Sequence, residues 1–485
     1  MDEVELKLTI AGDAVASLKD SDVLAAEPEV RLLHAVYHDT PDHALAGAGF
    51  SLRIRATGKK RVQTVKADGG LAAGLFVRSE WETPVGSNAP VIDDSTPLKA
   101  MLGDRTEEVA PIFEVDVERS IWTLHEGDAE IELVLDIGQV HAGSSSESIS
   151  EIELELKRGG PAALFDLARK LDAAAPLRLG VLSKAERGYR LTRPKRSVFK
   201  AEPVALDGEM KAAEAFQRIV QACLRQFRLN EAVLLEERSA EALHQARVAL
   251  RRLRSAFSIF KPLIGADQRA ASLRDELRWL AGELGNARNL DVLVDRVSAG
   301  KMRKRLKAAR EEAYASVEAT LASPRTRSLF LDLVEWLAAG KWLRAAKTQA
   351  ARNEPAREFA ASALNRLRRK VKKGGSDLEE TDDETRHEVR KDAKKLRYAS
   401  EFFAGLFDRK RERRRHKRFL SALEDLQDHL GALNDLATAP EEMIKLGLQD
   451  NAEAQKLLKN ENKGELIAKA AEAHEALVDA KRFWR

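Results

Sequence analysis

The spacing of the hydrophobic residues changes near Pro203, and this change most constrains how the chain can fold. Before it, short runs of alternating apolar and polar residues are separated by turn-forming residues such as Gly58, Gly127 and Gly143. Such regularly spaced runs predict the strands of an antiparallel sheet or barrel. After it, the sequence is rich in Ala, Leu, Arg and Glu at helical spacing. We therefore predict an α+β chain of 485 residues, with a β domain followed by an all-α domain.

The charge of the chain is divided at the same place. Residues 1–200 contain 25 Lys and Arg against 33 Asp and Glu, whereas residues 201–485 contain 56 against 45. This asymmetry indicates that the first half attracts metal cations and the second half a polyanion.

The single cysteine, Cys223, excludes an intramolecular disulfide and a Cys-rich zinc site. We find neither a signal-peptide pattern nor an apolar run of 18 residues, and expect a cytoplasmic protein without a membrane span.

Charged side chains recur at every second position of six predicted strands, and residues two apart share one face of a strand. These rows are Glu3/Glu5/Lys7, Arg53/Arg55, Arg78/Glu80/Glu82, Glu114/Asp116/Glu118, Glu130/Glu132 and Glu151/Glu153/Glu155/Lys157. On any single strand, such a face can be the solvated outside of a half-buried sheet. A sheet closed into a barrel would instead enclose all rows in a polar tunnel and pack its apolar face against helices. Carboxylates suit Mg²⁺ or Mn²⁺, and Arg and Lys suit phosphate, so the rows together predict a metal–polyphosphate ligand.

The order of short motifs in the first half resembles the CYTH family, the triphosphate tunnel metalloenzymes. The opening Glu-x-Glu-x-Lys resembles the family's signature, and further segments match in order at residues 37–45, 51–55, 64–67, 132–143, 150–159 and 182–191. Their order is most similar to bacterial inorganic triphosphatases in which a CYTH domain is fused to a CHAD domain. The resemblance implies a closed, eight-stranded antiparallel β tunnel that hydrolyses inorganic triphosphate to diphosphate and phosphate with Mg²⁺ or Mn²⁺.

The resemblance also implies roles for individual residues. The implied metal ligands are Glu3, Glu5, Glu153 and Glu155. The implied catalytic set is Glu3, Glu5, Lys7, Arg53, Arg55, Lys66 and Lys184, of which the basic members hold phosphate oxygens. Further candidates for substrate binding are Arg78, Arg119 and Arg187. Residues expected to line the tunnel or order water are Glu80, Glu114, Asp116, Glu132 and Asp136.

The helical half contains an internal repeat, because the segment that begins at Leu243 aligns without a gap with the segment that begins at Arg386. Each copy places one His and three basic residues on a single helix face. The two faces consist of His244, Arg247, Arg251 and Arg254, and of His387, Arg390, Lys394 and Arg397. Recurrence of the His-x-x-Arg spacing favours a site for anions over an ordinary solvated face. The denser run Arg409–Arg418 lacks this pattern, and we interpret it as a solvated helix.

Residues from about 210 to 485 resemble the CHAD family, whose two helical bundles share a basic groove that binds inorganic polyphosphate. We therefore divide the chain into a CYTH tunnel domain at 1–195, a linker at 196–208, and a CHAD domain at 209–485. The two repeats of the CHAD domain cover about 209–355 and 356–485. We expect no specific binding of nucleic acid, because contacts to phosphate carry no base information.

Three hypotheses about function follow from the sequence. The first is an inorganic triphosphatase with an appended domain for polyphosphate, which could deliver substrate, regulate the enzyme or target it to polyphosphate granules. The second is a non-catalytic polyphosphate-binding protein. The third is a CYTH enzyme that acts on thiamine triphosphate or a nucleoside triphosphate, or that cyclises ATP. No aromatic clamp for an organic group is evident in the tunnel motifs, which favours the first hypothesis.

Overall fold

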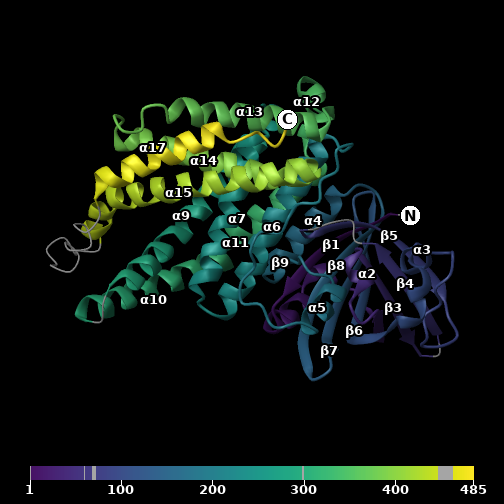
Figure 1. Cartoon of the computed structure of the whole chain (residues 1–485). Helices are drawn as coiled ribbons and strands as arrows, with labels where there is room; N and C mark the ends of the chain where they lie inside the picture. Colours follow the sequence, from purple (N-terminus) through teal and green to yellow (C-terminus); the bar gives the residue numbers. More distant parts are fainter. Residues whose placement is uncertain (1, 59, 68–72, 298–299, 446–461) are drawn as a thin grey trace.

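The computed structural model describes residues 2–58, 60–67, 73–297, 300–445 and 462–485 (Figure 1). Its strands are β1 (Asp2–Ile10), β2 (Glu29–Asp39), β3 (Phe50–Thr57), β4 (Lys60–Ala67), β5 (Leu75–Pro84), β6 (Ala110–Glu126), β7 (Ala129–Ala142), β8 (Ser145–Arg158) and β9 (Leu177–Leu179). Antiparallel neighbours follow the order β5-β4-β3-β2-β6-β7-β8-β1, and β5 pairs with β1. Eight strands therefore close into a barrel, as predicted, and β9 pairs with the end of β1.

The alternation of apolar and charged residues along β1, β7 and β8 decides which side chains point out of the barrel and which point into it. Apolar residues of these strands are buried in one cluster with the apolar side of α4 (Ala162–Ala174) and with the helical half of the chain. Members of this outer layer include Leu6, Leu8, Leu133, Leu154 and Leu164. The alternate, charged positions of the same strands point into the barrel. The prediction that the apolar face packs against helices is thus confirmed for these three strands.

Helix α5 (Lys184–Leu191) fills one end of the barrel interior. It begins with a capping box formed by Ser183 and Glu186, which fixes its first turn. Its buried side packs against inward apolar residues of β2, β6, β7 and β8. A Cβ atom at Gly188 would lie 2.1 Å from the ring of Phe113, so only glycine allows this close approach. The remaining helices of this half are short: α1 (Val15–Lys19), α2 (Ala44–Gly47) and α3 (Leu98–Leu102).

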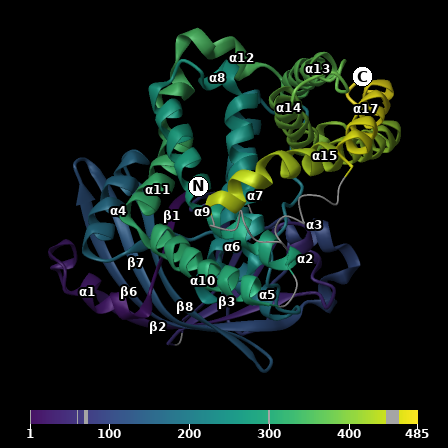
Figure 2. The same cartoon turned by 90° about the vertical axis from the view of Figure 1, so that its left-hand side faces the viewer.

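The helical half forms two groups that agree with the internal repeat. The first contains α6 (Ala212–Glu236), α7 (Ala240–Ile259), α9 (Gln268–Arg296), α10 (Lys301–Ala322) and α11 (Pro324–Ala339), with the short helices α8 (Lys261–Ile264) and α12 (Gln349–Asn353). The second contains α13 (Ala356–Gly374), α14 (Asp383–Phe402), α15 (Lys410–Lys445) and α17 (Lys463–Asp479). The first group lies between the barrel and the second group, and Figure 2 shows the same arrangement from the side. Within the described residues, no helix has the length and apolar character that a membrane crossing needs.

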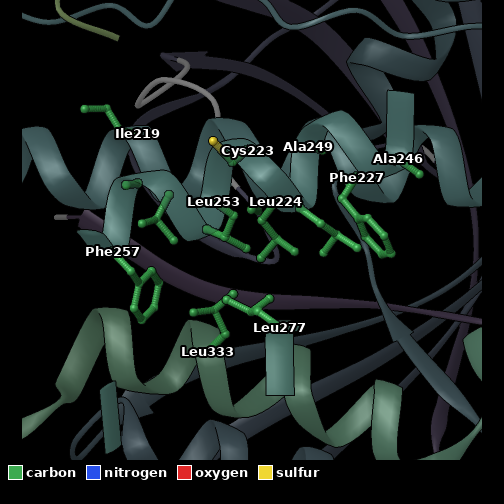
Figure 3. Packing of buried hydrophobic residues seen from close by; sticks show 14 of the residues in the cluster. Ile219, Cys223, Leu224, Phe227, Ala246, Ala249, Leu253, Phe257, Leu277 and Leu333 are labelled. Carbon is green, nitrogen blue, oxygen red and sulfur yellow. The ribbon is translucent and has the colours of Figure 1, made fainter. Parts of the chain in front are cut away.

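Close packing makes the first helical group a rigid support for the barrel. Figure 3 shows Leu224 of α6 beside Leu253 of α7, facing Leu277 of α9 and Leu333 of α11, while Phe227 lies further along α6 in the same buried cluster. The same hydrophobic cluster continues into the outer face of the barrel. Because this core contains residues of both halves, the two halves are held together by hydrophobic packing as well as by the segment that connects them.

The segment that we predicted as a linker is itself packed against α6. Phe199 is buried, and its backbone N–H and carbonyl both bond to the side chain of Asn230. Elsewhere, ion pairs join α4 to α11: Arg169 lies 2.8 Å from Asp332, and Arg327 lies 2.6 Å from Asp172. The orientation of the helical half relative to the barrel is therefore fixed by many contacts.

Candidate active site

The barrel encloses a cavity of about 580 Å³ lined mainly by charged side chains. All eight barrel strands and α5 contribute to it. Ten of the predicted site residues line this cavity: Glu5, Lys7, Arg53, Arg55, Lys66, Arg78, Arg119, Glu153, Glu155 and Lys184. The side chain of Glu3 lies outside the described part of the structure, although its backbone belongs to β1. Arg187 is not among the lining residues and lies against Glu147 and Glu151 instead.

A group of three carboxylates lies beside this cavity. One oxygen each of Asp136, Glu151 and Glu153 lie within 4.8 Å of one another, close enough to share a cation. Lys184 Nζ already lies 2.7 Å from Asp136, 2.5 Å from Glu151 and 2.8 Å from Glu153. Lys7 Nζ lies 2.9 Å from Glu151 and also contacts Glu153. The lysines and carboxylates thus form a buried network of opposite charges.

The sequence motifs did not single out Glu151 as a ligand, yet it is fully buried within this network. Its position two residues before Glu153 puts it on the same face of β8, which was the available signal. Its proximity to Lys184 depends on the placement of α5, which strand periodicity does not reveal.

The electrostatics of the network keep Glu153 and Asp136 ionised. Although burial works against ionisation, the ammonium groups of Lys184 and Lys7 and the guanidinium of Arg119 hold the pKa of Glu153 well below its usual value. Against the same effect of burial, Lys184 and Arg119 lower the pKa of Asp136. Arg119 binds Asp136 through both Nε, at 2.8 Å, and Nη2, at 2.6 Å. These acids are therefore available as anionic ligands at neutral pH.

Glu5, like Glu151, is a buried carboxylate that keeps one oxygen without a hydrogen-bond partner among the described residues. It is 3 % exposed, and its Oε1 accepts no hydrogen bond from any described residue, although Lys7 Nζ lies 3.4 Å away. Across the pairing of β1 with β8, Glu5 stands opposite Glu155, and Lys7 stands opposite Glu153. A buried carboxylate oxygen without a hydrogen-bond partner is a suitable ligand for a hard divalent cation. The assignment of Glu5, Glu153 and Glu155 as metal ligands stays a prediction, because the carboxylates whose oxygens lie within 4.8 Å of one another at this cavity are Asp136, Glu151 and Glu153.

A basic wall covers β3 and β4 within the cavity. Arg53 is enclosed, and its Nε has no hydrogen-bond partner among the described residues. Burial and the nearby guanidinium groups of Arg53 and Arg119 lower the pKa of Arg55. Lys66 lies 3.1 Å from Glu80. Because these cations repel one another, a phosphate anion between them would be stabilised.

Two expected lining residues, Glu114 and Asp116, face the other way. Both are exposed on the outside of β6, where Asp116 lies 2.8 Å from His34. The inward positions of this strand are Val115, Val117 and Arg119. Apolar residues point inward here because α5 fills this end of the barrel. By contrast, Glu80 and Glu132 line the cavity as expected, and Asp136 is buried beside it.

The two repeated basic faces of the helical half meet where α7 packs against α14. Burial, Arg390 and Arg251 lower the pKa of Lys394 to about 7, so Arg251 of one copy acts on Lys394 of the other. Burial and Arg251 likewise lower the pKa of Arg247 to about 10. Within the described ranges, no carboxylate lies within 4 Å of a side-chain nitrogen of Arg247, Arg251, Arg254, Arg390 or Lys394. Asp435 partly offsets the charge of Arg390 and Lys394, but cations still outnumber anions in this group, which makes it a candidate site for a polyanion.

The remaining members of these faces have other partners. His387 Nδ1 lies 2.5 Å from Asn434 Oδ1, and Arg397 is paired with Glu401 at 2.9 Å and Glu424 at 3.0 Å. His244 is half-buried, and burial together with Arg288 lowers its pKa. The separate run at 409–418 begins α15, and most of its basic side chains are exposed, which agrees with a solvated helix.

Comparison with known proteins places a family on each half of the chain. Residues 1–189 match the model of the CYTH domain, and residues 218–443 match the model of the CHAD domain. The chain is 33% identical over 200 residues to an inorganic triphosphatase of Haemophilus influenzae, which covers 39% of this chain and 55% of that protein. The chain thus spans about half the length of that relative.

Two further similar proteins match this chain over a larger share of their own length. An uncharacterised protein of Mycobacterium tuberculosis is 28% identical over 433 residues, which is 82% of this chain and 80% of that protein. The crystal structure of the CHAD domain from the plant Ricinus communis superposes with a TM-score of 0.48 and 29% identity. It covers 59% of this chain and 98% of that chain.

Proposed function

We propose that this chain, a CYTH domain followed by a CHAD domain, hydrolyses inorganic triphosphate to diphosphate and phosphate with Mg²⁺ or Mn²⁺. The reaction takes place in the barrel cavity. The observation that carries the proposal is the interleaving of buried carboxylates with Lys and Arg side chains in one enclosed space. The similarity of the CYTH domain to a protein named inorganic triphosphatase supports it.

The residues of the cavity divide into two chemical groups. Lys7, Arg53, Arg55, Lys66 and Lys184 hold phosphate oxygens and neutralise their charge, which is the main requirement of phosphoryl transfer. Glu5, Glu153 and Glu155 hold the divalent cation, which supplies further charge neutralisation and a more acidic water when it is bound. When phosphate draws the lysines away, their carboxylates become free to orient the attacking water. No nucleophilic side chain is needed for this chemistry.

The side chains that line the cavity favour a substrate without an organic ring. Tyr37 is the one aromatic side chain among the described lining residues. Its ring stacks on Phe113 with centroids 4.6 Å apart, so one face of it is covered. A nucleobase or a thiamine ring would therefore find little to stack on. We accordingly place inorganic triphosphate ahead of thiamine triphosphate and of nucleoside triphosphates, whether hydrolysed or cyclised.

Phosphate release from tripolyphosphate, ATP and thiamine triphosphate, each with Mg²⁺ and with Mn²⁺, tests this function. We expect the highest kcat/KM for tripolyphosphate and no release in excess EDTA. Turnover that persists without a divalent cation would contradict the proposed chemistry. A higher kcat/KM for ATP or thiamine triphosphate would keep the enzyme class and correct the substrate.

We further propose that the helical half binds inorganic polyphosphate where the two basic faces meet. The support for this is the group of Arg247, Arg251, Arg254, Arg390 and Lys394, which lacks paired carboxylates among the described residues and contains contributions from both repeats. A long anion between α7 and α14 would relieve the repulsion among these cations. Such binding would bring the enzyme to polyphosphate granules.

A further inference from the structure

We propose that Arg225, a residue of the helical half, positions Lys184 in the barrel cavity and so makes the activity of the barrel depend on the helical domain. The inference rests on the proposed function, because Lys184 is a phosphate-holding residue there. Arg225 touches neither the cavity nor the proposed substrate, and it acts through the cap of α5.

Arg225 lies on α6 and reaches the segment that leads into α5. It is 9 % exposed, and its guanidinium donates to the carbonyl of Val181 and, at 2.5 Å, to Glu186 Oε1. Arg228, one turn further along α6, donates from Nε to the carbonyl of Leu179 at 3.1 Å. Two arginines of the helical half therefore hold the last carbonyl group of β9 and one carbonyl group of the segment between β9 and α5. Buried charge-assisted bonds of this kind fix orientation more firmly than neutral ones.

The carboxylate of Glu186 connects Arg225 with the start of α5. While Oε1 accepts from Arg225, Oε2 accepts from the backbone N–H of Ser183 at 2.8 Å. Ser183 Oγ in turn accepts from the N–H of Glu186 at 3.1 Å, which completes the capping box. Arg225 thus fixes the rotamer of the residue that holds the cap in place.

Lys184 is the first residue of α5 after this cap, so its backbone position follows directly from the cap. Its ammonium group has to reach three carboxylates on two strands, Asp136 of β7 and Glu151 and Glu153 of β8. A shift of the first turn by about 1 Å would break this convergence, and a misplacement of that size can reduce the rate by about 10². The contacts therefore form a path from α6 through Glu186 and Ser183 to Lys184.

Loss of Arg225 should not unfold α5, because the helix has independent anchors. Tyr189 donates its hydroxyl to Asp39 at 2.8 Å, and Gly188 packs on Phe113. Before the helix, the N–H of Gly180 donates to the carbonyl of Lys7 at 2.8 Å. These contacts keep the segment folded while its first turn loses its orientation.

The test compares full-length wild-type protein with Arg225→Ala, Lys184→Met and the double variant. Arg218→Ala is the matched control, since Arg218 lies on the same helix and pairs with Glu214 at 3.0 Å on its surface. We expect Arg225→Ala to lower kcat/KM for tripolyphosphate by about tenfold to a hundredfold. We expect Arg218→Ala to leave kcat/KM unchanged. In the Lys184→Met background, Arg225→Ala should cause no further loss, because both changes remove the same contact.

The outcomes separate this inference from the proposed function. A wild-type protein without triphosphatase activity overturns the proposed function and this inference with it. An active wild-type protein with an unaffected Arg225→Ala variant overturns the positioning role alone, and so do losses that multiply in the double variant. If Arg225→Ala does not fold, as judged by thermal denaturation, Arg225→Lys takes its place in the same cycle, because its ammonium group keeps one of the two buried bonds.

Discussion

Lys184 Nζ on α5 lies 2.8 Å from Glu153 Oε1 on β8, and this ion pair joins the helix that fills one end of the barrel to the barrel wall. Burial opposes the charge on Lys184, but Asp136 and Glu151 together with Glu153 raise its pKa well above the usual value. Three cations, Lys7, Lys184 and Arg119, here face three carboxylates. This network is therefore charge-balanced before any ligand enters, and a metal–phosphate complex can bind to it by exchange of partners.

The first prediction concerns metal ligation by Glu5. Glu5→Gln should abolish turnover of tripolyphosphate with either Mg²⁺ or Mn²⁺, because a neutral amide is a poor substitute for a ligating carboxylate. The fold should be kept, since Glu5 Oε1 accepts no hydrogen bond among the described residues and the amide oxygen of a glutamine can still accept the bond from Arg78 Nη2. Phosphate release and thermal denaturation measure the two effects separately.

Glu114→Gln is the control for this change, because Glu114 is also a strand glutamate but lies exposed outside the barrel. It should leave activity unchanged. Equal activity of Glu5→Gln and wild-type protein would remove Glu5 from the metal site.

The second prediction concerns the basic wall. Arg53→Ala and Lys66→Ala should each lower kcat/KM by about 10²–10³, the usual cost of one strong transition-state contact. Stability should change little, because loss of Arg53 also relieves its repulsion of Arg55. Arg61→Ala provides the control, since Arg61 of the same β4 strand bonds to Asn88 and does not line the cavity. Variants that are unfolded rather than inactive would make these residues structural.

Strand periodicity, which is a local property, predicted the antiparallel strands and most of their charged face, whereas the closed eight-stranded barrel was predicted by the resemblance to the CYTH family. On β1 and β8, alternation alone puts Glu5 and Glu153 on the inner face, and the structure has them there. The helical repeat was equally visible, because its pattern recurs without a gap.

The errors arose where a distant segment decides which side of a strand is buried. On β6 both faces carry a regular pattern, and only the packing of α5 against Val115 and Val117 makes the apolar face the inner one. The same helix brings Lys184 to Glu151, and no local signal contains that contact. The role that we infer for Arg225 likewise depends on contacts between the two halves.

The third prediction separates a shaped site from overall charge in the helical half. Reversal of charge at Arg251 and Lys394 together should reduce the affinity for long-chain polyphosphate more than reversal at Arg411 and Arg414. The first pair lies where α7 meets α14, whereas the second pair is exposed on α15. Calorimetric titration of the full-length variants measures both affinities. Equal losses would show that total charge governs binding.

Competition adds a second measurement to this comparison. Affinity for any polyanion falls as salt rises, so salt dependence alone does not distinguish polyphosphate from DNA. At matched phosphate concentration, polyphosphate should displace DNA, because a bare flexible chain can enter a narrow site that a duplex cannot. Displacement in the opposite direction would favour nucleic acid as the ligand.

The fourth prediction concerns the pH dependence of polyphosphate binding. Burial, Arg390 and Arg251 lower the pKa of Lys394 to about 7, while Asp435 partly opposes this effect. Below this value Lys394 is charged in the unbound protein, and its contribution to affinity is constant. Above it, Lys394 is neutral in the unbound protein and has to take up a proton when polyphosphate binds. The affinity should therefore fall by up to about tenfold per pH unit, from pH 7 up to the higher pKa that Lys394 has in the complex.

Lys394→Arg should remove most of this dependence, because a guanidinium group stays charged throughout the range. Lys395→Arg is the matched control, since the neighbouring Lys395 pairs with Asp392 at 3.1 Å, and it should keep the wild-type slope. Burial and Arg288 lower the pKa of His244, so its titration lies below the chosen window. Titrations at pH 7, 8 and 9 measure the slope of log affinity against pH. An unchanged slope in Lys394→Arg would assign the pH dependence to another group and would place Lys394 outside the binding site.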